Sequence, residues 1–536
     1  MGKMDKETLN MITDTIDRIE NDRLPLEKKL EIDSSGKFPE ELIRFMLGPE
    51  VALHLVFIPE EYGGLGAEAT EIAVISERMA KMDLAIATSF LAICLGMDPL
   101  RVGATERQKE RYMKRIADEG LIVAYAVTEP NAGSNVQAIK TRAERVFDEK
   151  GNIKGYRLNG QKQFITNGGV ADLYTILANT PEGPSFFIVE RGAEGLIPGS
   201  HEDKHGIRGS NTCPITIEDL YVPAEDLVGE VEGRGLRQAN EVFGYTRLMV
   251  ATFGLGGGMA SLERAIRYSK ERVQFGTTLS EKQGYTHRLL VPNAVRLEAA
   301  RAYIEQTATR LDSGEKGLQV EGSIAKYFAT EAGDSMANDG IQALGGYGYI
   351  REYEMEKIKR DIKITTIFEG TNEIQRNIIA TFRMRENVKT KGGFYMEKAK
   401  KAMELGDRYS QKLALSLEII GEIIGFIRRN KLTRQQHLMF LLADMITWTE
   451  VGEALLQKVR SSDTDSEYGN YLNACLRLFL REVAEIGYVN GLKILSAGKD
   501  SKELKDMLFQ LDIPYLMKGY LDDMDIVCSY ILENYT

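Results

Sequence analysis

The spacing of apolar residues changes twice along the chain, and each change marks a different kind of structure. In residues 1–120, apolar residues recur at helical intervals, as at Leu9, Ile12 and Ile16. From about residue 121 the pattern becomes short and alternating, and it predicts strands at residues 123–127, 156–165, 174–177, 185–189 and 215–222. Because no long helical pattern separates these strands, we expect a small antiparallel β barrel or sandwich.

Helical spacing returns after residue 233 and continues almost to the end of the chain. Leu297, Ala300, Ile304 and Ala308 lie on one face of a predicted helix. Later helices are predicted at residues 396–403, 410–427, 437–459, 468–495 and 515–535. The predicted fold is multidomain α+β, with an N-terminal helical domain (1–120), a middle β domain (121–232), a C-terminal helical bundle (233–388) and an additional helical extension (389–536).

Glycine is expected both in turns and inside helices. Turns are predicted at residues 149–152, 159–160 and 182–184, between the predicted strands. The glycines of residues 254–258 lie inside a helical pattern that no strand precedes. We therefore expect close helix packing at this segment and not a dinucleotide-binding loop.

Composition limits the classes of function. The net charge of −11 argues against nucleic acid as the main partner, because binding phosphates requires an excess of Lys and Arg. Four cysteines lie far apart, which predicts neither a disulfide framework nor a metal site and favours a reducing compartment. Residues 413–427 form the most membrane-like run, but Glu418 and Glu422 interrupt it, so no integral membrane span is expected. We predict a cytoplasmic protein.

Candidate chemistry centres on residues 367–376, which have the sequence I-F-E-G-T-N-E-I-Q-R. Thr371 is placed to act as the N-cap of a helix that begins at the next residue. Glu369 lies on the turn before this helix, where Gly370 permits close approach of backbone or ligand. Taken alone, the segment favours an ordinary exposed acidic residue in the turn before a helix.

Six segments in the same order resemble the motifs of the acyl-CoA dehydrogenase family. They are residues 125–134 (Y-A-V-T-E-P-N-A-G-S), 164–169 (F-I-T-N-G-G), 206–210 (G-I-R-G-S), 271–276 (E-R-V-Q-F-G), 342–346 (Q-A-L-G-G) and 367–376. The resemblance covers about residues 30–385, so residues 394–536 lie outside it.

The resemblance implies an FAD-dependent enzyme that removes a proton from Cα and a hydride from Cβ of an acyl-CoA thioester, giving a trans-2-enoyl-CoA. Glu369 matches the position of the catalytic base. Some relatives carry the base on a bundle helix instead, where this chain has Tyr245 or Thr246. Neither is a carboxylate, so the role is assigned to Glu369.

The same resemblance implies the ligand contacts. The residues expected to bind FAD are Tyr125, Val127, Thr128, Gly133, Ser134, Phe164, Ile165, Thr166, Arg272, Phe275, Gln283, Gln342, Gly345, Gly346, Thr371 and Glu373. The residues expected to bind substrate are Ser134, Tyr245, Arg247, Gly370 and Arg376. No metal is expected. Gly244 departs from the family pattern, because many relatives have a ligand-contacting Asp at this position.

Partners follow from the same resemblance. Arg272 and Phe275 are expected to reach the FAD of a neighbouring subunit, which implies a homodimer or homotetramer. Electron-transfer flavoprotein is the expected electron acceptor. Two alternatives stay open at this point: an acyl-CoA oxidase that reduces O₂, and a catalytically silent FAD-binding assembly or scaffold protein.

Overall fold

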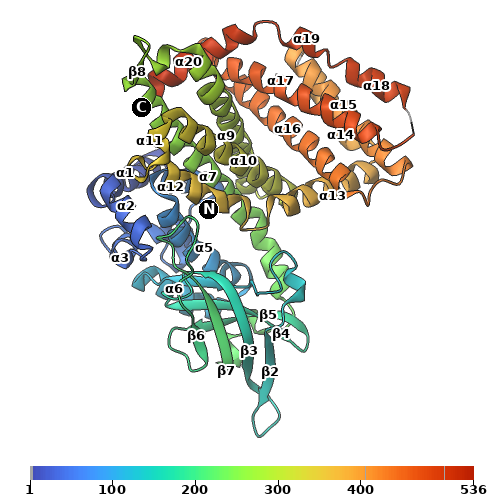
Figure 1. The fold of residues 1–536 in the computed structure, drawn as a ribbon. Helices are drawn as coiled ribbons and strands as arrows, with labels where there is room; N and C mark the ends of the chain where they lie inside the picture. The colour runs from blue at the N-terminus through green and yellow to red at the C-terminus, as the bar shows by residue number, and fades with distance from the viewer. Residues whose placement is uncertain (1–3, 405, 500, 536) are drawn as a thin grey trace. The chain divides into compact units, whose positions relative to one another are not determined.

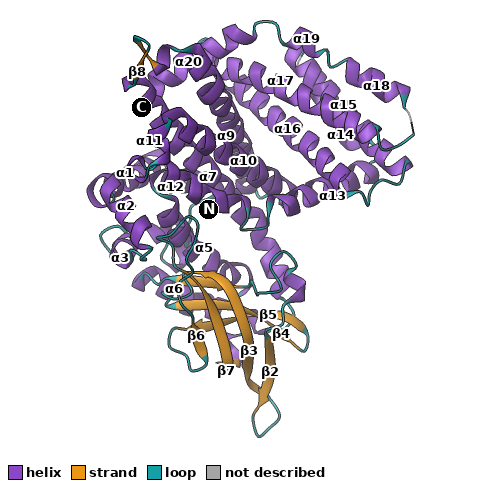
Figure 2. Cartoon of the chain, viewed as in Figure 1, coloured by secondary structure: helices purple, strands orange, loops and turns teal. Residues whose placement is uncertain are grey.

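The structure is a computed structural model that describes residues 4–404, 406–499 and 501–535, without the side chains of residues 242–245. The chain forms two compact units, Met1–Met249 and Val250–Thr536. The boundary between them falls inside one long helix, α7 (Gly235–Glu271). Strands are concentrated in the first unit, and the second is almost entirely helical (Figures 1 and 2).

The first unit begins with six α-helices. They are α1 (Lys6–Arg23), α2 (Leu26–Ser35), α3 (Glu40–Leu47), α4 (Ala69–Met82), α5 (Leu84–Gly103) and α6 (Glu106–Glu119). The apolar stretch that follows residue 69 is divided into α4 and α5 by Asp83. The side chain of Asp83 accepts hydrogen bonds from the backbone N–H groups of Ala85 and Ile86, and it thereby caps the start of α5.

Helix α5 is the most apolar long helix among the described residues. By length and composition it could cross a membrane, but 78% of its apolar window is buried inside the structure, as in the core helix of a globular domain. The expectation that residues 413–427 are the most membrane-like run was therefore wrong. That run lies in α15 (Arg408–Arg429), where Glu418 and Glu422 lower its hydropathy.

A seven-stranded sheet follows the helices. Its strands are β1 (Val123–Ala126), β2 (Arg142–Phe147), β3 (Ile153–Thr166), β4 (Leu173–Thr180), β5 (Gly183–Glu190), β6 (Leu196–Pro198) and β7 (Thr212–Pro223). The strand order is β1-β4-β2-β3-β7-β6, with β5 also paired to β4. Most pairs are antiparallel, as predicted, but β1 pairs with β4 in parallel, so the sheet is mixed.

Two strands and one supposed turn were not predicted correctly. Strand β2 alternates charged and apolar residues weakly, and β6 has only three residues, so neither gave a clear period-two pattern. The turn predicted at residues 159–160 is wrong, because these residues lie inside β3 at a shift in its pairing with β7. Gly160 is needed there for another reason: a Cβ on it would lie 2.7 Å from the Cα of Thr141.

The second unit is built from long helices. After α7 and the hairpin β8–β9 (Val273–Gln274 and Thr277–Thr278) come α8 (Gln283–Tyr285), α9 (Val291–Asp312), α10 (Gln319–Leu344), α11 (Gly346–Tyr349), α12 (Met355–Ile362), α13 (Asn372–Lys389), α14 (Gly393–Met403), α15, α16 (Gln436–Ser461), α17 (Glu467–Leu495), α18 (Lys502–Phe509), α19 (Ile513–Leu516) and α20 (Tyr520–Asn534). Helix α18 was not predicted, and the single helix predicted at 515–535 is interrupted at Gly519, whose φ is +73°.

The glycines of α7 allow close helix packing, as predicted. A Cβ on Gly254 would lie 2.7 Å from the backbone of α10 at Thr330, and a Cβ on Gly333 would lie 2.1 Å from the carbonyl oxygen of Gly254. Two helix backbones can approach this closely only where neither carries a side chain. Helix α10 is thereby packed directly against α7.

The C-terminal helices share a core with the bundle. The ring of Phe328 on α10 meets Trp448 on α16 and Phe479 on α17 edge-on, and the latter two rings stack with their centroids 5.2 Å apart. The buried guanidinium of Arg383 on α13 binds Glu450 on α16, with Nε–Oε1 and Nη2–Oε2 distances of 2.9 and 2.8 Å. The extension therefore packs on the bundle through both apolar and ionic contacts.

Candidate active site

The carboxylate singled out in the sequence lies on a left-handed turn. Glu369 has a φ of +53° and Gly370 a φ of +86°, and α13 begins two residues later. The hydroxyl of Thr371 accepts a hydrogen bond from the backbone N–H of Ile374, which confirms Thr371 as the N-cap. The side chain of Glu369 is half-buried.

The carbonyl groups of this turn are held by two buried side chains. The amide of Gln375, one turn into α13, donates to the carbonyl oxygens of Glu369 and Gly370 at 3.1 and 3.0 Å. The Nζ of Lys326, in the middle of α10, donates to the carbonyl oxygen of Gly370 at 2.9 Å. Both side chains have no exposed surface. The turn is thus fixed from α10 and α13 together.

Asn372 joins Lys326 to the rest of this network. Its Oδ1 accepts from Lys326 Nζ at 2.8 Å, and its Nδ2 donates to the hydroxyl of Thr330 and to Glu331 Oε1. Lys326 and Thr330 are four residues apart on α10 and so lie on the same face of that helix. One face of α10 therefore supports both the turn and the first residue of α13.

Arg376 was predicted to bind substrate, and its guanidinium already has partners in the structure. It donates to Asp444 on α16 and to the hydroxyl of Tyr327 on α10, and it lies over the Tyr327 ring at 4.2 Å. Gly370 lies on the turn itself, whereas Glu373 is exposed at the start of α13. The pKa of Glu373 is lowered, mainly by a hydrogen bond from its own backbone N–H.

In the first unit, two of the predicted FAD-binding segments lie side by side. The backbone N–H of Gln163 on β3 donates to the carbonyl oxygen of Thr128 at 2.9 Å. This contact brings Thr128 beside the part of β3 that continues into Phe164 and Thr166. Phe164 lies two residues before the end of β3, has a φ of +57° and is 64% exposed. An aromatic ring presented in this way is suited to stacking on a planar ligand.

The other predicted residues of these segments differ in what they offer a ligand. Val127 and Ile165 are buried, so only their backbone is available, while Tyr125 is half-buried. Gly133 and Ser134 are exposed, and a Cβ on Gly133 would meet nothing within 4 Å. The end of the sheet thus combines an exposed ring with open backbone, which fits a large planar cofactor such as an isoalloxazine.

A buried ion pair fastens the loop that carries Gly133 and Ser134. Lys162 on β3 donates to the carbonyl oxygen of Val127 and contacts Glu129 at 2.8 Å, and Glu129 also accepts from the backbone N–H groups of Lys140 and Thr141. Burial lowers the pKa of Lys162 to about 8, although Glu129 opposes this shift. Burial raises the pKa of Glu129, but Lys162 and the backbone donors outweigh it and leave the pKa lowered. The pair therefore closes residues 127–141 into a loop anchored at both ends.

The remaining predicted FAD contacts gather on an exposed surface of the second unit. Arg272, at the hairpin β8–β9, lies 5.7 Å from the ring centroid of Tyr347 on α11. Phe275 at the tip of the hairpin has a φ of +52° and is 97% exposed. Gln283, Gln342, Gly345 and Gly346 are exposed as well. Such exposure is unusual for an aromatic ring unless a ligand or another subunit covers it.

Two predicted substrate contacts lie on α7. Arg247 is buried, with 5% of its surface exposed, and Thr246 beside it is also buried. Tyr245 belongs to the same helix, but its side chain lies outside the described part of the structure. Its role in substrate binding stays a prediction.

Comparison with known proteins agrees with this arrangement. Three domain signatures match in order: acyl-CoA dehydrogenase N-terminal domain at residues 6–120, middle domain at residues 124–220 and C-terminal domain at residues 233–383. A cyclohex-1-ene-1-carbonyl-CoA dehydrogenase of Syntrophus aciditrophicus is 37% identical over 357 residues, which are 66% of this chain and 84% of the relative.

The chain belongs to the acyl-CoA dehydrogenase family.

Solved structures extend the match to the whole chain. An acyl-CoA dehydrogenase of Bacillus anthracis, complexed with FAD, superposes with a TM-score of 0.86 at 26% identity and covers 99% of this chain and 96% of its own. Butyryl-CoA dehydrogenase of Megasphaera elsdenii has a TM-score of 0.66 at 32% identity, and covers 72% of this chain and all of its own. The C-terminal helices are therefore shared with the first structure and lie outside the part that the second covers.

Membership of the acyl-CoA dehydrogenase family confirms three predictions from the sequence. The chain is an oxidoreductase of that family, its cofactor is FAD, and its fold combines a helical domain, a small sheet and a helical bundle. Among the described residues, no group of three or more His, Cys, Asp or Glu side chains could hold a metal ion.

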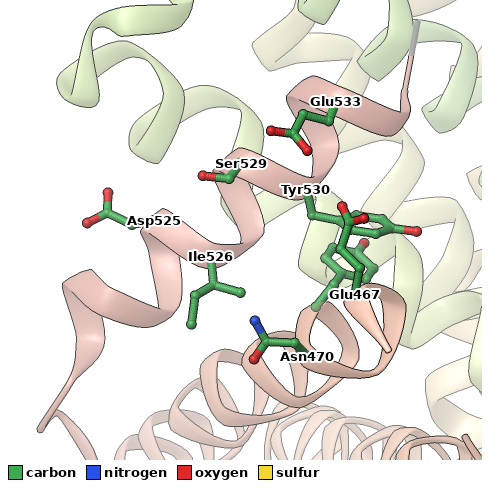
Figure 3. A pocket seen from close by; sticks show the side chains of 8 residues that line it. Glu467, Asn470, Asp525, Ile526, Ser529, Tyr530 and Glu533 are labelled. Carbon is green, nitrogen blue, oxygen red and sulfur yellow. The ribbon is translucent and has the colours of Figure 1, made fainter. Parts of the chain in front are cut away.

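A cavity elsewhere in the second unit is unsuited to an acyl-CoA. It has a volume of about 380 Å³, lies between α17 and α20, and is lined in part by Glu467, Asp525 and Glu533 (Figure 3). Tyr471 and Tyr530 also line it, and their rings stack with centroids 4.1 Å apart. CoA carries several phosphate charges, which these carboxylates would repel. The acidic lining therefore makes this cavity a poor site for CoA.

Four functional candidates were missed in the sequence: Lys326, Gln375, Lys162 and Glu129. Three of them lie within or beside the matched motifs, but an isolated polar residue in such a motif carries no sign of its partner. Lys326 offered a better signal, because it is a single charge within the apolar helical run of residues 324–329. A charge at a buried helical position requires a specific partner.

Proposed function

We propose that the protein catalyses the α,β-dehydrogenation of an acyl-CoA thioester to a trans-2-enoyl-CoA, with Glu369 as the base that removes the α-proton. One observation carries this proposal. Glu369 is a half-buried carboxylate on a left-handed turn whose two carbonyl groups are held by the buried side chains of Gln375 and Lys326. A base for so weak an acid as an α-C–H must be fixed in direction.

In this proposal two groups of Glu369 act on the substrate. Glu369 takes the α-proton, and its backbone N–H donates to the thioester oxygen, where negative charge develops as the proton leaves. The hydride that leaves Cβ would be taken up by bound FAD, which supplies the two-electron acceptor. The products are the enoyl-CoA, a protonated Glu369 and the reduced cofactor, so protons and electrons balance.

The FAD contacts are assigned to two surfaces. Thr128, Phe164 and Thr166 at the end of the sheet would hold the isoalloxazine, with backbone groups of Val127 and Ile165 at its polar edge. Arg272 and Phe275 at the hairpin would hold the pyrophosphate and adenine of a neighbouring subunit's FAD. A planar guanidinium donates two parallel hydrogen bonds to phosphate oxygens. This arrangement requires at least a homodimer, and a homotetramer also satisfies it.

Relatives guide the choice of acyl groups to test. The relative from Syntrophus aciditrophicus is named for a cyclic substrate, and the structure from Megasphaera elsdenii for a butyryl group. A substrate panel therefore needs cyclic, branched and straight acyl-CoA thioesters. Anaerobic titration of the FAD-loaded protein with this panel identifies the acyl group by the absorbance lost as the flavin is reduced.

Electron-transfer flavoprotein is proposed as the acceptor. The C-terminal helices kept an oxidase as an alternative, but a chain described as an acyl-CoA dehydrogenase shares them over nearly its whole length. A reducing, cytoplasmic location is proposed because all four cysteines are buried and none forms a disulfide within the described residues. Turnover under air without electron-transfer flavoprotein, accompanied by equimolar hydrogen peroxide, would instead identify an oxidase.

Glu369→Gln tests the proposed base. The variant keeps the size of the side chain and removes its basicity, so FAD content should match the wild type while the rate of flavin reduction by acyl-CoA falls at least ~1,000-fold, as expected when a general base is lost. Binding of enoyl-CoA, followed by the shift in the flavin spectrum, should persist. A Glu369→Gln enzyme that reduces its flavin at the wild-type rate would refute the proposal.

A further inference from the structure

Lys326 is a charged side chain in a place where burial is costly. It lies in the middle of α10, has no exposed surface, and is flanked on the helix by the buried residues Ala325 and Tyr327. An ammonium group is retained in such a position only if hydrogen bonds replace its hydration. Two of its hydrogen bonds are directed to the entry of α13: one to the carbonyl oxygen of Gly370 and one to Asn372.

Gln375 reaches the same turn from the other side. It has no exposed surface, and its amide nitrogen is shared between the carbonyl oxygens of Glu369 and Gly370. Its Oε1 is buried and has no hydrogen-bond partner within the described residues. A buried amide that leaves its own acceptor unsatisfied costs free energy. The two hydrogen bonds that its amide nitrogen donates to the carbonyl groups offset this cost.

The backbone held in this way is unfavourable by itself. Glu369 is a non-glycine residue at φ +53°, a conformation that is unfavourable for a residue with a side chain and persists only when its surroundings enforce it. Gly370 follows at φ +86°, and a Cβ there would lie 2.6 Å from the amide nitrogen of Gln375. Lys326 and Gln375 hold the carbonyl groups of these two residues.

We propose that Lys326 and Gln375 are positioning residues for proton abstraction: they hold the Glu369–Gly370 turn so that the carboxylate and the backbone N–H of Glu369 keep the directions that catalysis requires. This inference rests on the proposed role of Glu369 as base. Neither side chain needs to touch the substrate, because each acts through the backbone carbonyl groups of the turn.

The consequence is a specific pattern of kinetic damage. If the turn relaxes, the carboxylate moves relative to the α-carbon, and a displacement of about 1 Å can slow a reaction by about 100-fold. Binding of the acyl chain and of CoA depends on other groups, so affinity should change little. A merely structural role would instead lower FAD content, thermal stability and rate together.

The test uses the FAD-loaded, full-length protein with Lys326→Met and Gln375→Met, each of which keeps an unbranched side chain and removes the donors. Stopped-flow reduction by acyl-CoA should slow by about 10- to 100-fold in each, while FAD content and enoyl-CoA affinity stay within about 3-fold of wild type. Lys326→Gln retains a donor of shorter reach, and it should recover part of the rate lost in Lys326→Met.

A control variant removes a half-buried ammonium group elsewhere in the second unit. Lys398 on α14 donates to Glu453 on α16 at 2.6 Å, and this bond does not involve the Glu369–Gly370 turn. Lys398→Met should lower thermal stability but leave the rate of flavin reduction at the wild-type value. If Lys326→Met does not fold, Gln375→Met alone decides the outcome, because it removes no charge.

The outcomes separate this inference from the proposed function. If Glu369→Gln is inactive while Lys326→Met and Gln375→Met react at the wild-type rate, the positioning role of Lys326 and Gln375 is overturned. The role of Glu369 as base would then still stand. Rates that fall only in proportion to lost FAD would overturn the positioning role as well. An active Glu369→Gln enzyme would remove the proposed function itself.

Discussion

Two fully buried lysines, Lys162 and Lys326, hold two different parts of the predicted site, and they do so in different ways. Each donates to a backbone carbonyl group, Lys162 to that of Val127 and Lys326 to that of Gly370. Lys162 also forms an ion pair with Glu129, whereas a second bond of Lys326 goes to the neutral amide of Asn372.

The difference shows what each lysine is suited to do. Glu129 lies near the start of the loop of residues 127–141 and accepts from the backbone N–H groups of Lys140 and Thr141 at its end, so its ion pair with Lys162 is part of the closure of that loop. Two hydrogen bonds of Lys326 go to the entry of α13, to Gly370 and Asn372. Its charge also contributes, after the backbone N–H, the Thr371 hydroxyl and Arg376, to the lowered pKa of Glu373 at the start of α13. Breaking the Lys162–Glu129 ion pair should therefore mainly lower stability. Breaking the hydrogen bonds of Lys326 should mainly slow the reduction of the flavin.

The largest expected effect on stability tests the ion pair. Lys162→Met leaves the carboxylate of Glu129 buried without its cation, which should lower the free energy of unfolding of the sheet by about 3–5 kcal/mol. Amide hydrogen exchange in residues 127–141 measures this directly. As a control, Arg157→Met removes an exposed pair with Asp219 on the same sheet and should cost less than about 1 kcal/mol. If Lys162→Met and Arg157→Met lowered the free energy of unfolding equally, the stabilising role of the Lys162–Glu129 pair would be contradicted.

A smaller loss is expected from a glycine in the other region. Gly370→Ala places a Cβ at φ +86° and 2.6 Å from the amide nitrogen of Gln375, so it should cost about 1–3 kcal/mol and slow flavin reduction as well. Gly421→Ala on α15 is the control, because its added Cβ meets Tyr395 at an ordinary 3.6 Å. That variant should be neutral or slightly stabilising. Urea midpoints and stopped-flow rates of both variants decide the comparison.

The contribution of Lys162 to stability should also depend on pH. Burial lowers the pKa of Lys162 to about 8 from its ordinary 10.5, so between these values its side chain holds a proton in the unfolded chain that it has lost in the folded chain. The contribution of Lys162 to the free energy of unfolding therefore rises with pH in this window, by up to about 1.4 kcal/mol for each pH unit. The rise should be present in wild type and absent in Lys162→Met. If the urea midpoints of wild type and Lys162→Met changed by the same amount between about pH 8 and about pH 10, this prediction would be contradicted.

Features set by neighbouring residues were predictable from the sequence. The Thr371 cap, the helix-packing glycines of α7 and the order of helices and strands all follow from residues a few positions apart. The lysine contacts were not predictable, because Lys162 is 35 residues from Val127 and Lys326 is 44 residues from Gly370. No spacing rule connects such positions. The parallel pairing of β1 with β4 escaped prediction for the same reason.

The most direct measurement of the central claim follows the α-proton itself. Oxidised, FAD-loaded enzyme is mixed anaerobically with acyl-CoA in D₂O, and deuterium at Cα of the recovered substrate is measured by mass spectrometry for wild type and Glu369→Gln. The account predicts that wild type introduces deuterium at Cα and that Glu369→Gln does so at least ~100-fold more slowly, with its FAD still bound. Deuterium incorporation at equal rates in the two proteins would show that another group removes the proton.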